Sequence, residues 1–184
     1  MSGRISKNQG LSALTVGLGL YIIISAAFML AVRNWLFKVF GDFWVNFSFK
    51  ASFVFLTSGV MTYAFRIRLG IFRGCLALCI FVLAFLFSMW QPYFSEKTHV
   101  LNYGLLGYLS AKDLVTRKTN PALKSVSLSL LFISLISASD EIFQGFLPYR
   151  VAELRDFITN IISGFFGASL LFAMNKKAIF ERSA

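Results

Sequence analysis

Acidic residues are scarce in this chain: only 8 of its 184 residues are Asp or Glu, against 18 Lys and Arg. Charged residues of both signs make up 14% of the sequence, 57% is hydrophobic, and the mean hydropathy is +0.71. Soluble domains carry about 25% charged residues, so this composition argues against one. Apolar runs long enough to cross about 30 Å of hydrocarbon recur along the chain, which indicates a polytopic membrane protein.

Cysteine and histidine are also rare. Cys75 and Cys79 lie four residues apart in one apolar run, so they imply no disulfide framework, and we expect both in the helical core. His99 is the single histidine, and no His-x-x-Glu pair or P-loop accompanies it. We therefore expect no resident metal or other cofactor.

Alternating runs of about ten residues, which a transmembrane β-barrel needs, are absent. The sequence instead predicts one all-α domain over 1–184, an integral membrane helical bundle of about six transmembrane helices plus an interfacial amphipathic segment. The apolar run 10–32 is longer than the apolar core of a signal peptide, so we expect it to be a retained helix. The predicted helices are 10–32, 49–65, 74–90, 95–111, 122–145 and 156–174, with aromatic and basic residues of 33–50 in the interface.

The net charge of +10 does not indicate a nucleic-acid partner, because the basic residues form short clusters between apolar runs. With the N-terminus inside, six crossings place 12 Lys and Arg on the inner side and 6 on the outer side. This bias predicts that both termini are cytoplasmic. The same arrangement brings the unusual polar residues together at the outer face.

Four of the acids lie in residues 139–167, between two apolar segments. A charged side chain in a membrane helix costs roughly 2.5–3.5 kcal/mol, so such residues usually face an interior and have a function. The plain alternative is a juxtamembrane turn with solvated charges. Helical spacing favours a site, because residues three, four or seven apart share a face. We predict general acid–base roles for Glu141, His99 and Asp156, and ligand-binding roles for a second set: Arg150, Gln144, Asn160, Asp140, Glu96, Lys97 and Tyr103.

Purely structural roles for these residues stay open as alternatives. Arg150 could clamp a phosphate through two hydrogen bonds, or it could only neutralise Asp140 or Glu141. His99 could be a proton-transfer group or a packing residue. Stripes of Ser and Gly on the same helices are typical of close helix packing.

At these residues the chain resembles the VanZ-like family of bacterial membrane proteins. The resemblance covers about 93–170. Its three elements are Glu96-Lys97-Thr98-His99 through Tyr103-Gly104, Asp140-Glu141-Ile142-Phe143-Gln144 followed by Arg150, and Asp156 to Asn160 followed by Gly164 and Gly167.

The resemblance implies a protein of the bacterial cytoplasmic membrane with a role in the cell envelope, in teicoplanin-type glycopeptide resistance or surface-polysaccharide biogenesis. We predict an outward-facing polar pocket, formed by the last three helices, that binds the phosphorylated headgroup of a membrane lipid or lipid-linked glycan. If it is catalytic, Glu141 or His99 would be the base and Arg150 would stabilise phosphate charge. The alternatives are a non-enzymatic transporter or resistance factor, and a scaffold with envelope-assembly protein partners.

Overall fold

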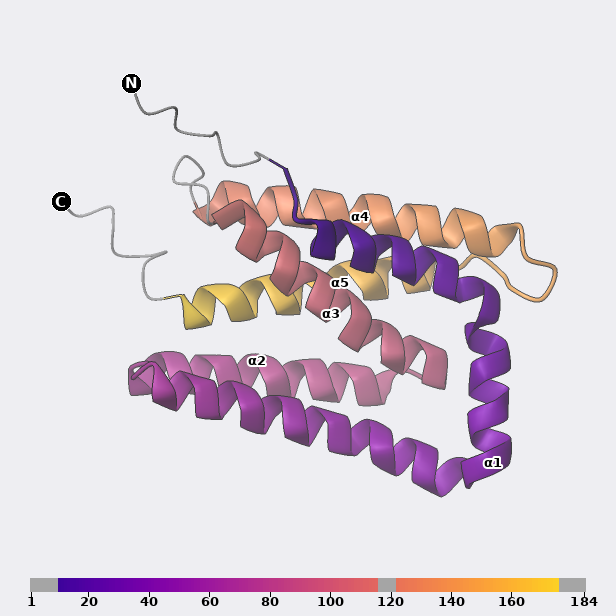
Figure 1. Ribbon diagram of the computed structural model, residues 1–184, viewed down its shortest axis with the longest axis horizontal. Helices are drawn as coiled ribbons and strands as arrows, with labels where there is room; N and C mark the ends of the chain where they lie inside the picture. The colour runs from indigo at the N-terminus through magenta and orange to yellow at the C-terminus, as the bar shows by residue number, and fades with distance from the viewer. Residues whose placement is uncertain (1–9, 116–121, 176–184) are drawn as a thin grey trace.

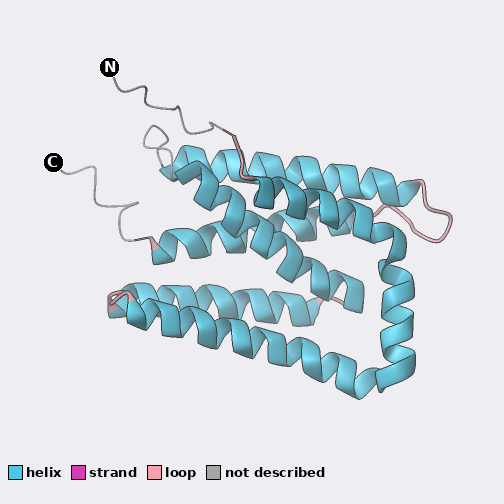
Figure 2. Ribbon diagram, in the orientation of Figure 1, coloured by secondary structure: helices cyan, strands magenta, loops and turns pink. Residues whose placement is uncertain are grey.

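The computed structural model describes residues 10–115 and 122–175, and these ranges contain five helices and no strand (Figure 2). The helices are α1 (Ala13–Arg66), α2 (Ile71–Trp90), α3 (Phe94–Val115), α4 (Ala122–Gly145) and α5 (Leu154–Met174). The all-α prediction is confirmed. The last four helices begin and end within a few residues of the predicted bounds.

The predicted count of six membrane helices is wrong. The first two predicted helices and the interfacial segment 33–50 form one element, α1, whose only non-helical residue is Gly41 at φ 76°. Glycine tolerates this left-handed conformation. Figure 1 shows α1 running along the bundle, turning down its side and returning next to α2. The predicted break is therefore confined to Gly41, the kink at which two helical arms of α1 meet.

Four of these helices, α1, α2, α4 and α5, are long and apolar enough to cross a membrane. This fits a multi-pass membrane protein. Large apolar side chains cover their outer surfaces, including Phe65 at 87%, Phe72 at 80% and Phe55 at 78% exposure. Cys75 and Cys79 share this exposed surface of α2, so their predicted place in the core is wrong. In a membrane, such a surface faces lipid rather than water.

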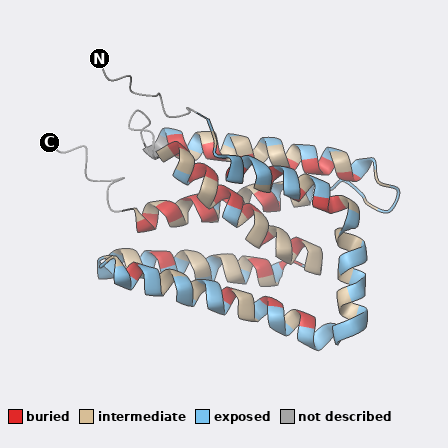
Figure 3. Ribbon diagram, viewed as in Figure 1, coloured by how far each residue is buried: buried red, intermediate tan, exposed pale blue. Residues whose placement is uncertain are grey.

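The centre of the bundle is α3, which packs most extensively against α5. Glycine makes this approach possible: a Cβ on Gly107 would collide with the Gly164 carbonyl, and a Cβ on Gly167 with the Gly104 carbonyl. Ile133 of α4 then fills the space beside Gly164. Small residues at a crossing let membrane helices approach this closely. Figure 3 shows buried residues concentrated where α3, α4 and α5 meet.

The helices meet at two distinct ends. At one end, the backbone N–H of Ser12 and the Thr15 hydroxyl donate to Asp113, while Arg73 donates to the Asn175 carbonyl. The starts of α1 and α2 therefore lie by the ends of α3 and α5. At the other end, α3 begins where α5 begins and where α4 ends (Figure 1). The predicted site residues gather at this second end, which we call the site end.

Candidate functional site

A pocket opens at the site end between α1, α3 and α4, beneath the loop 146–153 that joins α4 to α5. Its polar lining comes from α1, α3, α4 and the loop that follows α4. Its apolar wall comes largely from α1, through Ile22, Ala26, Met29, Leu30, Val32 and Leu36. Its polar lining includes Ser25, Arg33, Ser95, Thr98, His99, Asn102, Tyr103, Asp140, Gln144 and Arg150. The pocket thus combines an apolar side with a polar floor and rim.

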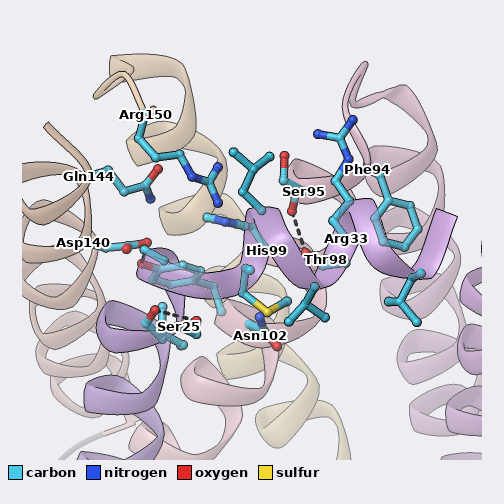
Figure 4. A pocket seen from close by; sticks show the side chains of 17 residues that line it. Ser25, Arg33, Phe94, Ser95, Thr98, His99, Asn102, Asp140, Gln144 and Arg150 are labelled. Atoms are coloured by element: carbon cyan, nitrogen blue, oxygen red, sulfur yellow. Dashed lines mark hydrogen bonds between the residues drawn. The ribbon is translucent and has the colours of Figure 1, made fainter. Parts of the chain in front are cut away.

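Two arginines stand at the rim on opposite sides. In Figure 4 the guanidinium of Arg150 points toward His99, and Arg33 lies across the pocket beside Ser95 and Phe94. Arg150 forms no ion pair with a carboxylate of the described residues, and its Nε is buried without a hydrogen-bond partner there. Arg33 stacks over the Phe37 ring at 5.9 Å from the centroid. Neither arginine is therefore held in an ion pair by a carboxylate of the described residues, although Asp140 and Asp156 attract Arg150.

The loop that carries Arg150 is held at two points. The Tyr149 hydroxyl donates to the Ala27 carbonyl of α1 at 2.6 Å. The backbone N–H of Glu153 donates to Glu141 Oε2 at 2.9 Å. These two hydrogen bonds fix the loop between α1 and α4, so they position Arg150 over the pocket.

A line of hydrogen bonds runs behind the pocket from His99 to Asp140. His99 Nδ1 lies 3.0 Å from Asn160 Oδ1, and the Asn160 amide nitrogen donates to Ser137 Oγ at 2.9 Å. Ser137 in turn lies beside the Tyr103 hydroxyl, which donates to Asp140 Oδ2 at 3.1 Å. The Tyr103 ring also stacks on His99, with centroids 5.8 Å apart. Tyr103, Ser137 and Asn160 are fully buried, so this network holds the pocket floor rigid.

The network fixes the tautomer of His99. Asn160 Oδ1 is a carbonyl oxygen and can only accept a hydrogen bond, and it faces His99 while the amide nitrogen donates to Ser137 Oγ. His99 must therefore carry a proton on Nδ1. In the neutral ring, Nε2 is then unprotonated and is able to accept a hydrogen bond from a ligand.

A second charged group lies outside the pocket, at the start of α5. Arg155 donates to Glu96 Oε1 at 2.5 Å and to Glu153 Oε2 at 3.2 Å, and its guanidinium lies 5.7 Å from the centroid of the Tyr93 ring. The Asp156 carboxylate lies 3.9 Å from Arg155. Arg155 thus joins the first turns of α3 and α5, and we interpret this group as a structural clasp.

The predicted site residues therefore divide between two places. The pocket is lined by five of them, His99, Tyr103, Asp140, Gln144 and Arg150, with Asn160 bonded behind His99. The other four do not line it: Glu141 holds the loop, Glu96 and Asp156 lie by Arg155, and the carbonyl of Lys97 accepts from Ser88. The pocket is also not formed by the last three helices alone, because α1 supplies one wall and α5 supplies no lining residue.

Sequence reasoning missed the contribution of α1. Arg33 was assigned to an interfacial segment, and Ser25 is one hydroxyl in a long apolar run. Gly41 follows both residues in the sequence, so the bend there does not explain why they line the pocket. A possible signal was Arg33 itself, a cation on the outer side where the charge bias predicts few.

No family model matches the chain, and no curated protein or solved structure matches it either.

The arrangement suits ligand binding at a membrane surface. The two arginines can bind an anion, the apolar α1 wall can contact an acyl chain, and His99 and Asp140 can accept hydrogen bonds. Among the residues that the structure describes, no group of three His, Cys, Asp or Glu side chains has the geometry to hold a metal ion.

Proposed function

We propose that this chain is a multi-pass protein of the bacterial cytoplasmic membrane whose pocket binds the phosphorylated headgroup of an envelope lipid or lipid-linked glycan. The pocket faces outward and both termini lie in the cytoplasm. The charge bias of the sequence supports this orientation, because α1 runs along the bundle and back (Figure 1), so both of its ends lie on the side that six crossings assign to them.

Arg150 is the observation that carries the proposal. It makes no ion pair with a carboxylate of the described residues, and it lies over the pocket in a loop that is hydrogen-bonded at Tyr149 and Glu153. Guanidinium groups bind phosphate through paired hydrogen bonds, and low-dielectric surroundings strengthen the attraction. Arg33 supplies a second positive charge, while Asp140 is the only acid in the lining.

The apolar wall favours a lipid over a free anion. Six apolar side chains of α1 line the pocket, and α1 is long and apolar enough to cross a membrane. A ligand that lies partly in the bilayer can place its acyl chain against α1 and its phosphate under Arg150.

The resemblance to the VanZ-like family supports an envelope role, in glycopeptide resistance or in surface-polysaccharide biogenesis. We assign the pocket a binding role and no reaction, since Glu141 and Asp156 lie outside the lining. Transport and scaffolding stay as alternatives, and no contact of the described residues favours either.

Native mass spectrometry of the purified full chain tests the proposal. We expect a co-purified lipid whose fragmentation yields a phosphate-containing headgroup, and we expect Arg150→Gln to lose most of it. Arg66→Gln is the matched control, because Arg66 is an exposed arginine at the opposite end of the bundle. Equal lipid content in wild type and both variants would overturn the proposal.

A further inference from the structure

The pocket lining contains one buried hydrogen-bond donor and one buried acceptor that the described residues leave without a partner. Arg150 Nε is the donor and Asp140 Oδ1 is the acceptor, and both atoms are buried. Asp140 is 1% exposed, and its other oxygen already accepts from Tyr103. A buried polar atom without a partner costs free energy, so each of these atoms calls for a complementary group.

We infer that the ligand headgroup carries a hydrogen-bond donor in addition to its phosphate, and that this donor binds Asp140 while the phosphate binds Arg150. This inference rests on the proposed function and specifies the chemical class of ligand. The donor is an amine or a hydroxyl group attached to a phosphodiester. A bare phosphate monoester lacks such a group.

The position of Asp140 supports this assignment. Tyr103 and the hydrogen-bond network behind it hold the carboxylate in place, and in Figure 4 Asp140 and Arg150 lie on the same side of the pocket with Gln144 between them. A negative charge at this point repels a phosphate that comes close to it. A headgroup that places its phosphate at Arg150 and its donor at Asp140 satisfies both charges at once.

Gln144 is the competing donor. Its side chain lies next to the Asp140 carboxylate, although Asp140 Oδ1 has no hydrogen bond that meets geometric criteria. If Gln144 or a bound water donated the missing hydrogen bond to Asp140 Oδ1, the pocket would not discriminate between headgroups with and without a donor. The experiment separates these cases.

Four lipids with identical dioleoyl chains serve as probes: phosphatidylethanolamine, phosphatidylglycerol, phosphatidylcholine and phosphatidic acid. The first offers N–H donors, the second offers hydroxyl donors, the third has a quaternary ammonium without N–H, and the fourth has no group beyond phosphate. Each is titrated into the delipidated full chain in detergent, and occupancy is read by native mass spectrometry. We expect phosphatidylethanolamine or phosphatidylglycerol to bind about tenfold more tightly than phosphatidylcholine, as one hydrogen bond to a charged group predicts. Whichever of the two binds better identifies the donor.

Variants separate this inference from the proposed function. Asp140→Asn should reduce the preference over phosphatidylcholine severalfold while Arg150-dependent binding persists. Asp42→Asn, which changes an exposed acid at the bend of α1, should keep the full preference. The preference is a ratio within one preparation, so a less stable variant still reports it, and the wild-type comparison needs no variant. Equal binding of all four lipids that still depends on Arg150 would overturn the inference alone. Binding that is independent of Arg150 would overturn the proposed function.

Discussion

His99 and Asn160 face each other across α3 and α5, with Nδ1 of the imidazole 3.0 Å from Oδ1 of the amide. Because Asn160 donates its amide nitrogen to Ser137, the ring proton must sit on Nδ1. His99 is the only histidine of the chain, so its imidazole signals can be observed without interference.

We predict that neutral His99 is the Nδ1–H tautomer. Histidine-selective ¹⁵N labelling of the full chain in detergent, measured at alkaline pH, distinguishes the two tautomers by their nitrogen shifts. Asn160→Ala should remove the preference for Nδ1–H, and Ser134→Ala, on the same helix as Ser137, should preserve it. An Nε2–H tautomer in the wild type would contradict the network that we describe.

Glycine contacts between α3 and α5 yield a stability prediction. Gly167→Ala should destabilise the protein by about 1–3 kcal/mol or more, because its Cβ would meet the backbone of α3 and backbone cannot move aside as a side chain does. Gly59→Ala, at a helical position with open space around it, should stay within about 1 kcal/mol of the wild type. Thermal unfolding in detergent measures both. Equal losses in the two variants would show that the crossing is not this close.

Asp113 links the end of α3 to the start of α1, and this link predicts that the stability of the fold depends on pH. Burial alone would raise the pKa of Asp113, but hydrogen bonds from Thr15 and Ser12 outweigh it and hold the pKa below its usual value. A lowered folded-state pKa stabilises the fold fully above the unfolded-state value of about 3.9, and this contribution is lost as pH falls through the folded-state pKa.

Asp113→Asn should therefore lower the melting temperature at pH 7. The difference from the wild type should shrink below pH of about 4, as the wild-type carboxyl takes up its proton. Melting curves of both proteins across this range provide the check. A difference that grows as pH falls would mean that Asp113 does not stabilise the fold as a carboxylate.

The proposed orientation predicts which end of the bundle faces outward. In a background with Cys75→Ser and Cys79→Ser, Val151→Cys at the site end should react with a membrane-impermeant maleimide in intact cells. Gly70→Cys, at the opposite end, should react only after the membrane is opened. Both positions are exposed, so accessibility within the fold does not limit either reaction. The reverse labelling pattern would place the pocket in the cytoplasm.

The sequence predicted four of the five helices closely, because their apolar runs end at Pro, Gly or charged residues. It did not predict α1 as one bent helix, since aromatic and basic residues such as Trp35 and Lys38 are typical of interfacial segments as well as of exposed helix surfaces. Helical spacing placed Tyr103 and Asn160 on inward faces correctly.

Helical spacing could not show which neighbouring helix or loop each inward-facing side chain contacts. Asp140 and Glu141 are adjacent on α4 and both are buried, yet Asp140 lines the pocket and Glu141 bonds the loop before α5. Which side each carboxylate takes depends on how α4 is rotated against α3 and α5. In this rotation Ile133 packs against Gly164, a contact that periodicity does not predict.

An experimental structure of the full chain with dioleoylphosphatidylethanolamine tests the central claim most directly. The account predicts lipid density in the pocket between α1, α3 and α4, with the phosphate within about 3 Å of the Arg150 guanidinium and an acyl chain along α1. A pocket that holds only water, with lipid bound elsewhere and Arg150 paired to a carboxylate of the protein, would contradict it.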